Sequence, residues 1–484
     1  MKKVMKLSLA ASILALAMNA NASDDINSKI DSLQKQINEL KNSQLDVNDE
    51  LEERIDEVET LTMTDKIQFG LDFRTQMNNF DAKDATGKSS KDNNLWTNRL
   101  RLNLSSQMTD DMKFKARLSM YKNWAGDGVG NINTMSNVDM IQGRRPNDST
   151  LFVERAYVDW TAIKGDIPVT FTIGRGPTSD GPSHQYKDNG VRKATYSALS
   201  FDAIADSIVA TLNLQKVSGV NGMSLRLAYG KGSQDSQPGS YVGNHLGDAM
   251  EDMNYYGTFF ETGLGMEGSL LQLSTLLTKD VVAMTPGNAS IGDLQLSTAM
   301  LEFTNIKSTG IDFFAHYAVS KVKPNGAYGL MDPKSPISMT NPPMGFLTNT
   351  PGDTSTKSGN AFWVGTRYTM PFESMNNPRI GIEYNKGSKN WFNFTQASNS
   401  LTNKLAARGD AIEVYYIQPI NRFAHIRIGA EMIDYDYTMS GFQVGAPMSM
   451  SQANQAATMM GVTGFQMGAI DKLSNYYLVF NVTY

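Results

Sequence analysis

Residues 473–484 read LSNYYLVFNVTY. Every second position in this stretch is apolar or aromatic: Tyr476, Leu478, Phe480, Val482 and Tyr484. Successive side chains of a β-strand point to opposite faces, so these five residues form one apolar stripe, long enough to face the hydrocarbon of a thin bilayer. Tyr477 and Val479 interrupt the alternation, and a soluble edge strand can carry a similar pattern. If the stripe faces lipid, the rest of the chain must supply a closed barrel.

The composition is compatible with one large β domain. The chain has 484 residues, no cysteine, 40 glycines, 19% charged residues and a net charge of -5. After the leader there is no uncharged apolar run of about 18 residues, which argues against a helical membrane protein. The absence of cysteine excludes a disulfide scaffold and a thiolate metal site.

Residues 1–22 have the features of a secretory signal peptide. Lys2, Lys3 and Lys6 precede an apolar core from Leu7 to Met18, and Ala20-Asn21-Ala22 forms a small-x-small cleavage pattern. We therefore expect the mature chain to begin at Ser23.

Residues 23–63 show heptad spacing, which predicts a periplasmic coiled coil. The seam positions are Ile26, Ile30, Leu33, Ile37, Leu40, Val47, Leu51, Val58 and Leu61. Gln44 and Arg54 interrupt the seam, and a single helix folded back on the barrel is the alternative. Self-association as a homotrimer suits a porin, whereas Ile at a with Leu at d favours dimers in simple peptides, so the oligomer number stays open.

From residue 64 to residue 484 the period is two, and we predict an all-β, transmembrane antiparallel barrel of sixteen strands, with eighteen as the alternative. The turns MTDD, TAIKGDI, QKVSGVNG, EG, NIKSTG, MPFESMNNP and PINR are short and would lie at one end. Long loops would alternate with them, beginning with Asn78 to Asn94. The run 195–203, TYSALSFDA, could pass for a seventeenth strand, but it would reverse the parity of all later loops. We therefore place it in a third loop from about Gly174 to Ala205, long enough to enter the lumen.

Charged residues lie opposite the lipid stripe on the first four strands. The predicted basic wall consists of Arg74, Arg99, Arg101, Lys113, Lys115, Arg117 and Arg155. Fixed charge in a low-dielectric pore concentrates counter-ions, so this wall could select anions. The alternative is that these cations stabilise the wall by pairing with acidic loop residues.

Two further groups of charged residues complete the expected pore. The predicted opposite wall carries Glu383, Glu413, Arg427 and Glu431, which would give a field across the lumen. The third loop has glycines and prolines for tight bends. Its predicted constriction residues are Arg175, Asp180, His184, Lys187, Asp188, Arg192 and Lys193.

Catalysis and cofactor binding find little support in the sequence. The four histidines are scattered, and neither GxSxG nor HExxH occurs. GRGPTSDG lacks the phosphate-loop pattern. The methionines of the last loop, such as Met448 and Met450, could hold Cu(I), but methionine is also a general apolar filler. We predict no enzyme activity, no cofactor and no metal site.

The order of parts resembles the outer-membrane porins of Gram-negative bacteria. The stretches that carry the resemblance are FGLDFRTQ, NRLRLNLSSQMTDDMKFKARLSMYK, ERAYVDW and FTIGRGP. They look most like the phosphate-selective O/P-type porins and the DUF3373 porin-like family. The aromatic C-terminal residue likewise resembles the closing strand that marks such chains for the barrel-insertion machinery. In O/P-type porins a basic ladder binds phosphate, and Arg99, Arg101, Lys113 and Lys115 are compatible with such a role.

The resemblance implies a porin in the outer membrane, with the coiled coil in the periplasm and passive diffusion of small hydrophilic solutes. Its partners would be outer-membrane lipid and lipopolysaccharide, the insertion machinery and further copies of the chain, but not nucleic acid. Two alternatives stay open. One is a structural protein or cell-wall tether with a plugged barrel, and the other is a receptor or adhesin that acts through its loops.

Overall fold

The computed structural model describes residues 32–41, 67–124, 149–233, 252–282, 290–327, 345–395 and 398–484. The chain divides into two units, Met1–Ile67 and Gln68–Tyr484. In the first unit, residues 32–41 form a helix whose predicted seam residues Leu33, Ile37 and Leu40 are exposed. The predicted signal peptide lies outside the described residues, as does most of the predicted coiled coil. Within the described residues, no helix is both long and apolar enough to cross a membrane.

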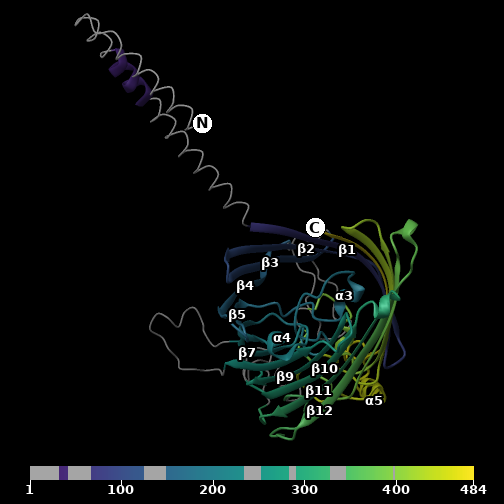
Figure 1. Ribbon diagram of the computed structural model, residues 1–484. Coiled ribbons are helices and arrows are strands. Elements are labelled where there is room, and N and C mark those ends of the chain that lie inside the picture. Colours follow the sequence, from purple (N-terminus) through teal and green to yellow (C-terminus); the bar gives the residue numbers. More distant parts are fainter. Residues whose placement is uncertain are drawn as a thin grey trace, which may run out of the picture. The chain divides into compact units, whose positions relative to one another are not determined.

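The second unit is a closed antiparallel barrel of sixteen strands (Figure 1). The strands are β1 (Ile67–Asp84), β2 (Ser89–Thr109), β3 (Met112–Asn123), β4 (Phe152–Ile163), β5 (Val169–Arg175), β6 (Asp206–Asn213), β7 (Ser224–Ser233), β8 (Met253–Thr262), β9 (Ser269–Lys279), β10 (Gly292–Phe303), β11 (Ile311–Pro324), β12 (Lys357–Thr369), β13 (Arg379–Gly387), β14 (Gly409–Pro419), β15 (Ala424–Tyr435) and β16 (Ile470–Thr483). The predicted count of sixteen is confirmed. The stretch 195–203 lies in a loop, as predicted, and its only bridge partner among the described residues is Phe394, through Phe201.

The short helices lie in the connections. They are α3 (His184–Lys187), α4 (Gln215–Ser218) and α5 (Met450–Met460), with 3-10 turns η2 (Ile306–Ser308), η4 (Glu373–Met375) and η5 (Lys404–Ala406). We call the end of the barrel with the short connections the turn end and the opposite end the loop end.

The last strand closes the barrel against the first. In the β1–β16 register, Arg74 lies opposite Asn481 and Asn78 opposite Tyr477. Tyr476, Phe480 and Tyr484 are exposed on the outer face, whereas Tyr477 and Val479 are buried on the lumen side. The two residues that interrupt the apolar alternation therefore face inward, and the predicted outward stripe is confirmed. Tyr477 fits there because its ring lies over Gly429, where a Cβ would have no room.

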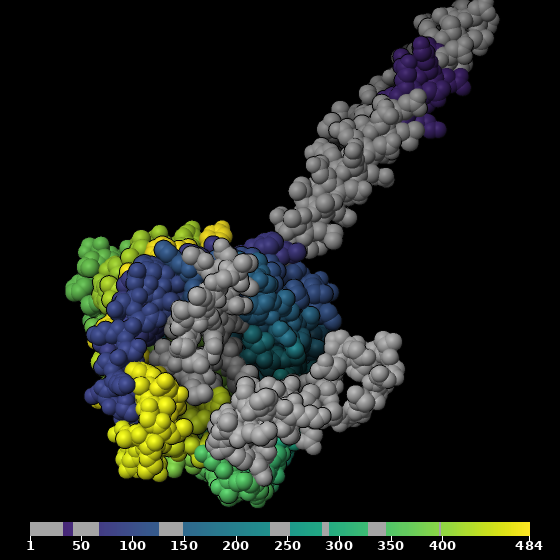
Figure 2. Space-filling model, turned by 180° about the vertical axis from the view of Figure 1, so that it is seen from behind, coloured from purple at the N-terminus to yellow at the C-terminus, as the bar shows by residue number. Residues whose placement is uncertain are grey.

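The connection between β1 and β2 differs from the prediction. Asn78 to Asn94 is not a long loop, because β1 continues to Asp84 and β2 begins at Ser89. This polar hairpin needs no apolar outer face if it extends beyond the bilayer. Its tip is held by the loop before β16, since the backbone N–H of Phe465 donates to the Asp84 carboxylate at 3.0 Å. Figure 2 shows this last loop (yellow) lying beside the early strands (blue).

On the outer face, a band of apolar side chains lies between aromatic residues at the turn end and tyrosines with acid–base pairs at the loop end. Exposed Ile173, Ile208, Leu273, Ile382 and Ile428 lie in the band. Exposed aromatic residues mark the turn end, namely Phe69, Trp160, Phe372 and Tyr484. Tyrosines and acid–base pairs mark the loop end: Tyr229, Tyr256, Tyr476, Arg175–Asp206, Lys231–Asp252, Lys279–Asp293, Lys386–Asp410 and Lys472–Asp434.

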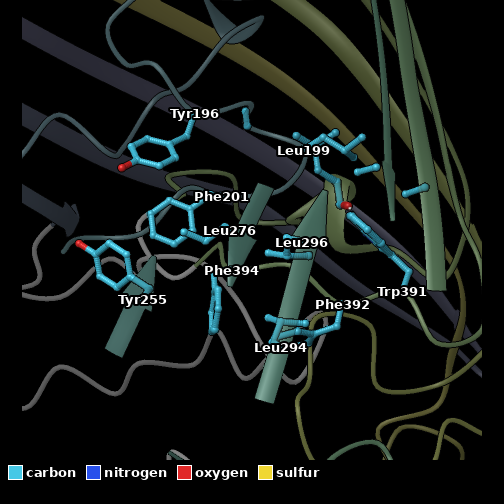
Figure 3. Close-up of a cluster of buried hydrophobic side chains, with 14 of the residues drawn as sticks. Tyr196, Leu199, Phe201, Tyr255, Leu276, Leu294, Leu296, Trp391, Phe392 and Phe394 are labelled. Atoms are coloured by element: carbon cyan, nitrogen blue, oxygen red, sulfur yellow. Dashed lines mark hydrogen bonds between the residues drawn. The ribbon is translucent and has the colours of Figure 1, made fainter. Parts of the chain in front are cut away.

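Part of the lumen is filled by an apolar core. Lumen-facing Leu294 and Leu296 of β10 are almost completely buried. They pack in one cluster with side chains from residues 176–205, which we call the third loop, and from residues 388–408, which we call the seventh loop (Figure 3). The loop residues in this cluster include Tyr196, Leu199, Phe201, Trp391, Phe392 and Phe394. The barrel is therefore packed from within along this side.

Candidate pore constriction

The third loop enters the barrel, and Figure 1 shows its helix α3 inside the ring of strands. The tip is anchored on β10 and β11. Ser183 Oγ lies 2.9 Å from His316 Nε2 and also donates to the Glu302 carboxylate, while Ser197 Oγ lies 2.6 Å from His316 Nδ1. Arg367 donates to the Tyr186 carbonyl at 2.8 Å. Because the two serines, His316 and Glu302 are buried, releasing the loop would leave these polar groups without partners.

The seventh loop holds the third loop from the loop-end side. The Phe394 N–H donates to the Ser200 carbonyl at 3.1 Å, and the Asp202 N–H donates to the Phe394 carbonyl at 2.6 Å. The Asn393 side chain donates to the Leu199 carbonyl at 2.8 Å. The two loops therefore form one inserted body, of which only the third loop was expected from the sequence.

The arginines of the predicted basic wall face the lumen but are paired. Arg99 contacts Asp72 at 3.0 Å. Arg101 contacts Asp180 of the third loop at 2.6 Å, and Arg117 contacts the same carboxylate at 3.1 Å. These contacts match the alternative in which cations pair with acidic loop residues. The wall is consequently less positive than the sequence suggested.

The remaining residues of the predicted basic wall differ in their burial and in their contacts. Arg155 donates to the Ser179 hydroxyl at 3.1 Å and is buried. Lys115 pairs with Asp159 at 2.8 Å near the turn end and is more exposed. Lys113 lies opposite Asp159 in the β3–β4 register, and no ion pair of Lys113 is found among the described residues. Arg74 is buried and lies opposite Asn481 in the β1–β16 register.

Glu154 is a lumen residue that the sequence analysis missed. The β3–β4 register shifts between Arg117 and Leu118, so that both Glu154 and Arg155 are buried. The extra residue of a β-bulge breaks the alternation on which face assignment depends. Glu154 contacts Arg101 and Arg117 at 3.3 Å each, and thereby neutralises part of the basic wall. The sequence around Glu154 shows no simple pattern that would have indicated the bulge.

The residues of the predicted opposite wall lie on adjacent strands. Glu383, Glu413 and Glu431 are successive cross-strand neighbours on β13, β14 and β15. Lys404 of the seventh loop, also missed from the sequence, contacts Glu383 and Glu413 at 2.6 Å each. Glu431 accepts a hydrogen bond from Asn475 at 3.2 Å.

The third loop spans the space between these walls. Lys187 contacts Glu413 at 2.9 Å, Asp188 contacts Arg427 at 2.9 Å, and Lys193 contacts Asp72 at 3.4 Å. Arg192 pairs with Glu261 of β8. The His184 ring packs against Trp363, with ring centroids 5.4 Å apart.

Arg175 does not belong to this loop constriction. It ends β5 and pairs with Asp206 at 3.1 Å, and both side chains are exposed. The prediction failed because the strand continues through Gly174 to Arg175, and the alternation of β5 puts Arg175 on the same outer face as Ile173.

The environment of the third loop shifts the pKa values of its acids in opposite directions. Burial disfavours ionised Asp180, but Arg101, Lys193 and Arg117 hold its pKa well below the usual range. Burial, together with the Asp180 carboxylate, raises the pKa of Asp202 to about 8. Burial and the Lys187 charge lower the pKa of His184. At neutral pH, Asp180 is therefore ionised, Asp202 is mostly protonated and His184 is neutral.

A polar hollow remains between the third loop, the seventh loop and the wall formed by β1, β2, β14, β15 and β16. Its cavity volume is about 60 Å³, and it is partly open to the rest of the lumen. Arg74, Arg99, Arg427, Glu413 and Glu431 line it, together with Asp188 and Lys187 of the third loop. Both signs of charge thus face one water-accessible space, while the apolar core fills another part of the lumen.

A sequence profile of the family "Protein of unknown function (DUF3373)" matches residues 89–484. No curated protein matches the chain. Among solved structures, OmpF of Salmonella typhi in complex with daunomycin is similar at 10% identity and a TM-score of 0.46, over 87% of this chain and 99% of that one. OprB of Pseudomonas putida, in a high-pH structure, is similar at 12% identity and a TM-score of 0.49, over 88% of this chain and 96% of that one.

Proposed function

We propose that this chain, which belongs to the DUF3373 family, is an outer-membrane channel for passive diffusion of small hydrophilic solutes. The observation that carries the proposal is the polar hollow inside a closed barrel, lined by charged residues of both signs. Such a lining replaces part of the hydration of a polar solute, whereas the outward apolar band suits lipid. Transport by diffusion requires neither catalysis nor a cofactor.

The location follows from the same features. The apolar band lies between aromatic and acid–base sets, as expected for a barrel in a bilayer. The predicted signal peptide would direct the chain across the inner membrane, and the aromatic final strand would be read by the insertion machinery. We further propose a homotrimer whose coiled coils lie in the periplasm, with lipopolysaccharide around the loop end.

Single-channel recording tests this function. Purified, heat-modifiable protein in a planar bilayer should give stable conductance steps, in groups of three if the channel is a trimer. The steps should be small, since loops occupy much of the lumen. Folded protein that gives no steps would contradict the proposed channel.

Ion preference is a separate part of the proposal. The predicted anion selectivity rests on the basic wall, but Asp72, Glu154 and Asp180 neutralise much of its charge. We therefore expect a weak anion preference, measured as the zero-current potential across a salt gradient. A cation-directed potential would refute anion preference and leave the channel proposal intact.

A structural protein with a plugged barrel is the second candidate. The apolar core favours it, because Trp363, Trp391 and Leu294 are buried inside the barrel and no solute could pass through them. A plugged barrel would stay silent in the bilayer, and a tether would retain cell-wall material during purification.

A further inference from the structure

One end of the polar hollow presents buried hydrogen-bond donors without partners. Arg74 makes no hydrogen bond or ion pair among the described residues, although only 7% of it is exposed. Its Nη2 and the Nε atoms of Arg99 and Arg427 are buried without a hydrogen-bond partner within that part of the chain. All three arginines line the hollow. Buried donors of this kind are costly unless a ligand or water accepts from them.

The hollow also presents hydrogen-bond acceptors. Asn475 donates its Nδ2 to Glu431, and its Oδ1 is buried without a partner among the described residues. Glu431 has no cation within ion-pair distance in that part of the chain, whereas the neighbouring Glu413 is paired with both Lys187 and Lys404. Carboxylate and amide oxygens together suit an ammonium group, which carries donors only.

The remaining charges of the hollow are already in ion pairs. Arg427 is paired with Asp188, Arg99 with Asp72, and Asp180 with Arg101. Among the lining residues with ionisable side chains, Arg74, Glu431 and Asp202 are without an ion pair within the described residues, and Asp202 is mostly protonated at neutral pH. Of the other two, Arg74 is basic and Glu431 is acidic. A simple anion would satisfy Arg74 alone, and a simple cation Glu431 alone.

The strand register separates these two groups along the wall. Arg74 lies opposite Asn481, which lies opposite His425, and Glu431 is six positions farther along β15. At about 3.3 Å per residue, the backbone levels differ by roughly 20 Å, and both side chains line the same hollow. A single amino acid spans roughly 3.5 Å and cannot reach both groups, whereas a peptide of three to five residues spans roughly 10–17 Å when extended.

We propose that the hollow is a binding site for short zwitterionic peptides. The peptide carboxylate contacts Arg74, with Arg99 and Arg427 nearby, and the peptide ammonium contacts Glu431 and Asn475. This inference rests on the proposed channel function, since it names the solute class of the same hollow.

The test compares triglycine with N-acetyl-triglycine and with triglycine amide, each of which lacks one terminal charge. Binding is measured by calorimetry with folded, detergent-solubilised full-length protein. Triglycine should bind about tenfold or more tightly than either capped peptide, as expected for the loss of a charge-assisted contact. Equal affinity for acetyl-triglycine would indicate a plain anion site and overturn the proposal, as would the absence of triglycine binding.

Matched variants locate the site. Arg74→Gln should remove the preference for a free carboxylate, and Glu431→Gln the preference for a free ammonium. Lys113→Gln, on the same basic wall but outside the hollow, should leave all three affinities unchanged. If a variant fails to fold, the capped-peptide series on the natural chain still decides the proposal.

Conductance measurements distinguish failure of the peptide site from failure of the channel. If triglycine blocks the current more strongly than its capped forms do, both the peptide site and the channel are supported. Current that none of the peptides affects, without binding in solution, refutes the zwitterion site and keeps the channel. Binding without any current refutes the channel and keeps the site.

Discussion

Lys404 shows how a single buried charge can hold an inserted loop. Its ammonium lies between the Glu383 and Glu413 carboxylates, and only 2% of its side chain is exposed. Burial disfavours the charged lysine, but the two glutamates raise its pKa above the usual range. Lys404 is therefore charged at all ordinary pH values, and its removal would leave two adjacent carboxylates with less compensation.

We predict that Lys404→Met destabilises the barrel strongly. Breaking a buried ion pair by removing one partner typically costs about 3–5 kcal/mol. Lys386→Met is the control, because Lys386 pairs with Asp410 on the exposed outer face, where such pairs contribute about 0–1 kcal/mol. Urea unfolding in detergent micelles, followed by tryptophan fluorescence, measures both changes. A loss no larger than that of the control would contradict the role assigned to Lys404.

Asp202 gives a second prediction at the residue scale. Its pKa is raised from 3.8 to about 8 by burial and by Asp180. An acid whose pKa is raised by folding stabilises the docked loop fully below the unfolded pKa of 3.8 and loses this contribution as the pH rises toward 8. We expect proteolysis of the third loop to increase between about pH 4 and pH 8 without a further increase above pH 8, and Asp202→Asn to remove this increase. The same pH dependence in the variant would show that another group is responsible.

At the scale of elements, the seventh loop passes very close to β12. A Cβ at Gly359 would lie 2.3 Å from the backbone of Asn390, whereas a Cβ at Gly190 in the third loop would lie 3.8 Å from its nearest neighbour. We predict that Gly359→Ala displaces the seventh loop and that Gly190→Ala does not. Single-channel conductance should rise only in the Gly359 variant, with a red-shifted Trp391 emission. Unchanged conductance would mean that the loop can shift without opening a path.

The strands that the sequence predicts well are those with apolar side chains on one face and polar or charged side chains on the other. β16 and β3 alternate clearly, so their outward stripes and inward charges could be assigned without the structure. The bulge at Glu154 and Arg155 escaped because one extra residue leaves no compositional trace. On β10, Leu294 and Leu296 face inward and are covered by distant loops. A strand that is apolar on its lumen face gives no sign of what covers it, so the core inside the barrel could not be predicted.

The sequence predicted which charged residues of the candidate site face the lumen, but not which of them form ion pairs with one another. The sequence placed arginines and glutamates on lumen faces, because alternation fixes the direction of a side chain. Which carboxylate meets which cation depends on the path of two inserted loops. Asp180 lies 79 positions from Arg101, and Lys404 lies 21 positions from Glu383 and 9 from Glu413 on the next strand. No local sequence pattern indicates such contacts.

At the scale of the whole molecule, tryptophan side chains lie on both the outer and the lumen side of the barrel wall and can report which side contacts lipid. Trp160 is exposed on the outer face, while Trp363 and Trp391 are fully buried in the lumen. In variants that keep one of these tryptophans and replace the other four by phenylalanine, we expect brominated acyl chains to quench Trp160 and to leave Trp363 and Trp391 unaffected. Equal quenching of all three would contradict the membrane-embedded barrel.

The seam between the first strand and the last makes the order of synthesis matter. Leu71 and Tyr484 exchange two backbone hydrogen bonds of 2.8 Å each, so the ring closes only when β16 pairs with β1. A chain in which β16 has not yet been made cannot complete the ring, so the free edge of β1 stays unpaired until β16 is in place. Because pairing between such distant residues is slow, the waiting chain is exposed to aggregation.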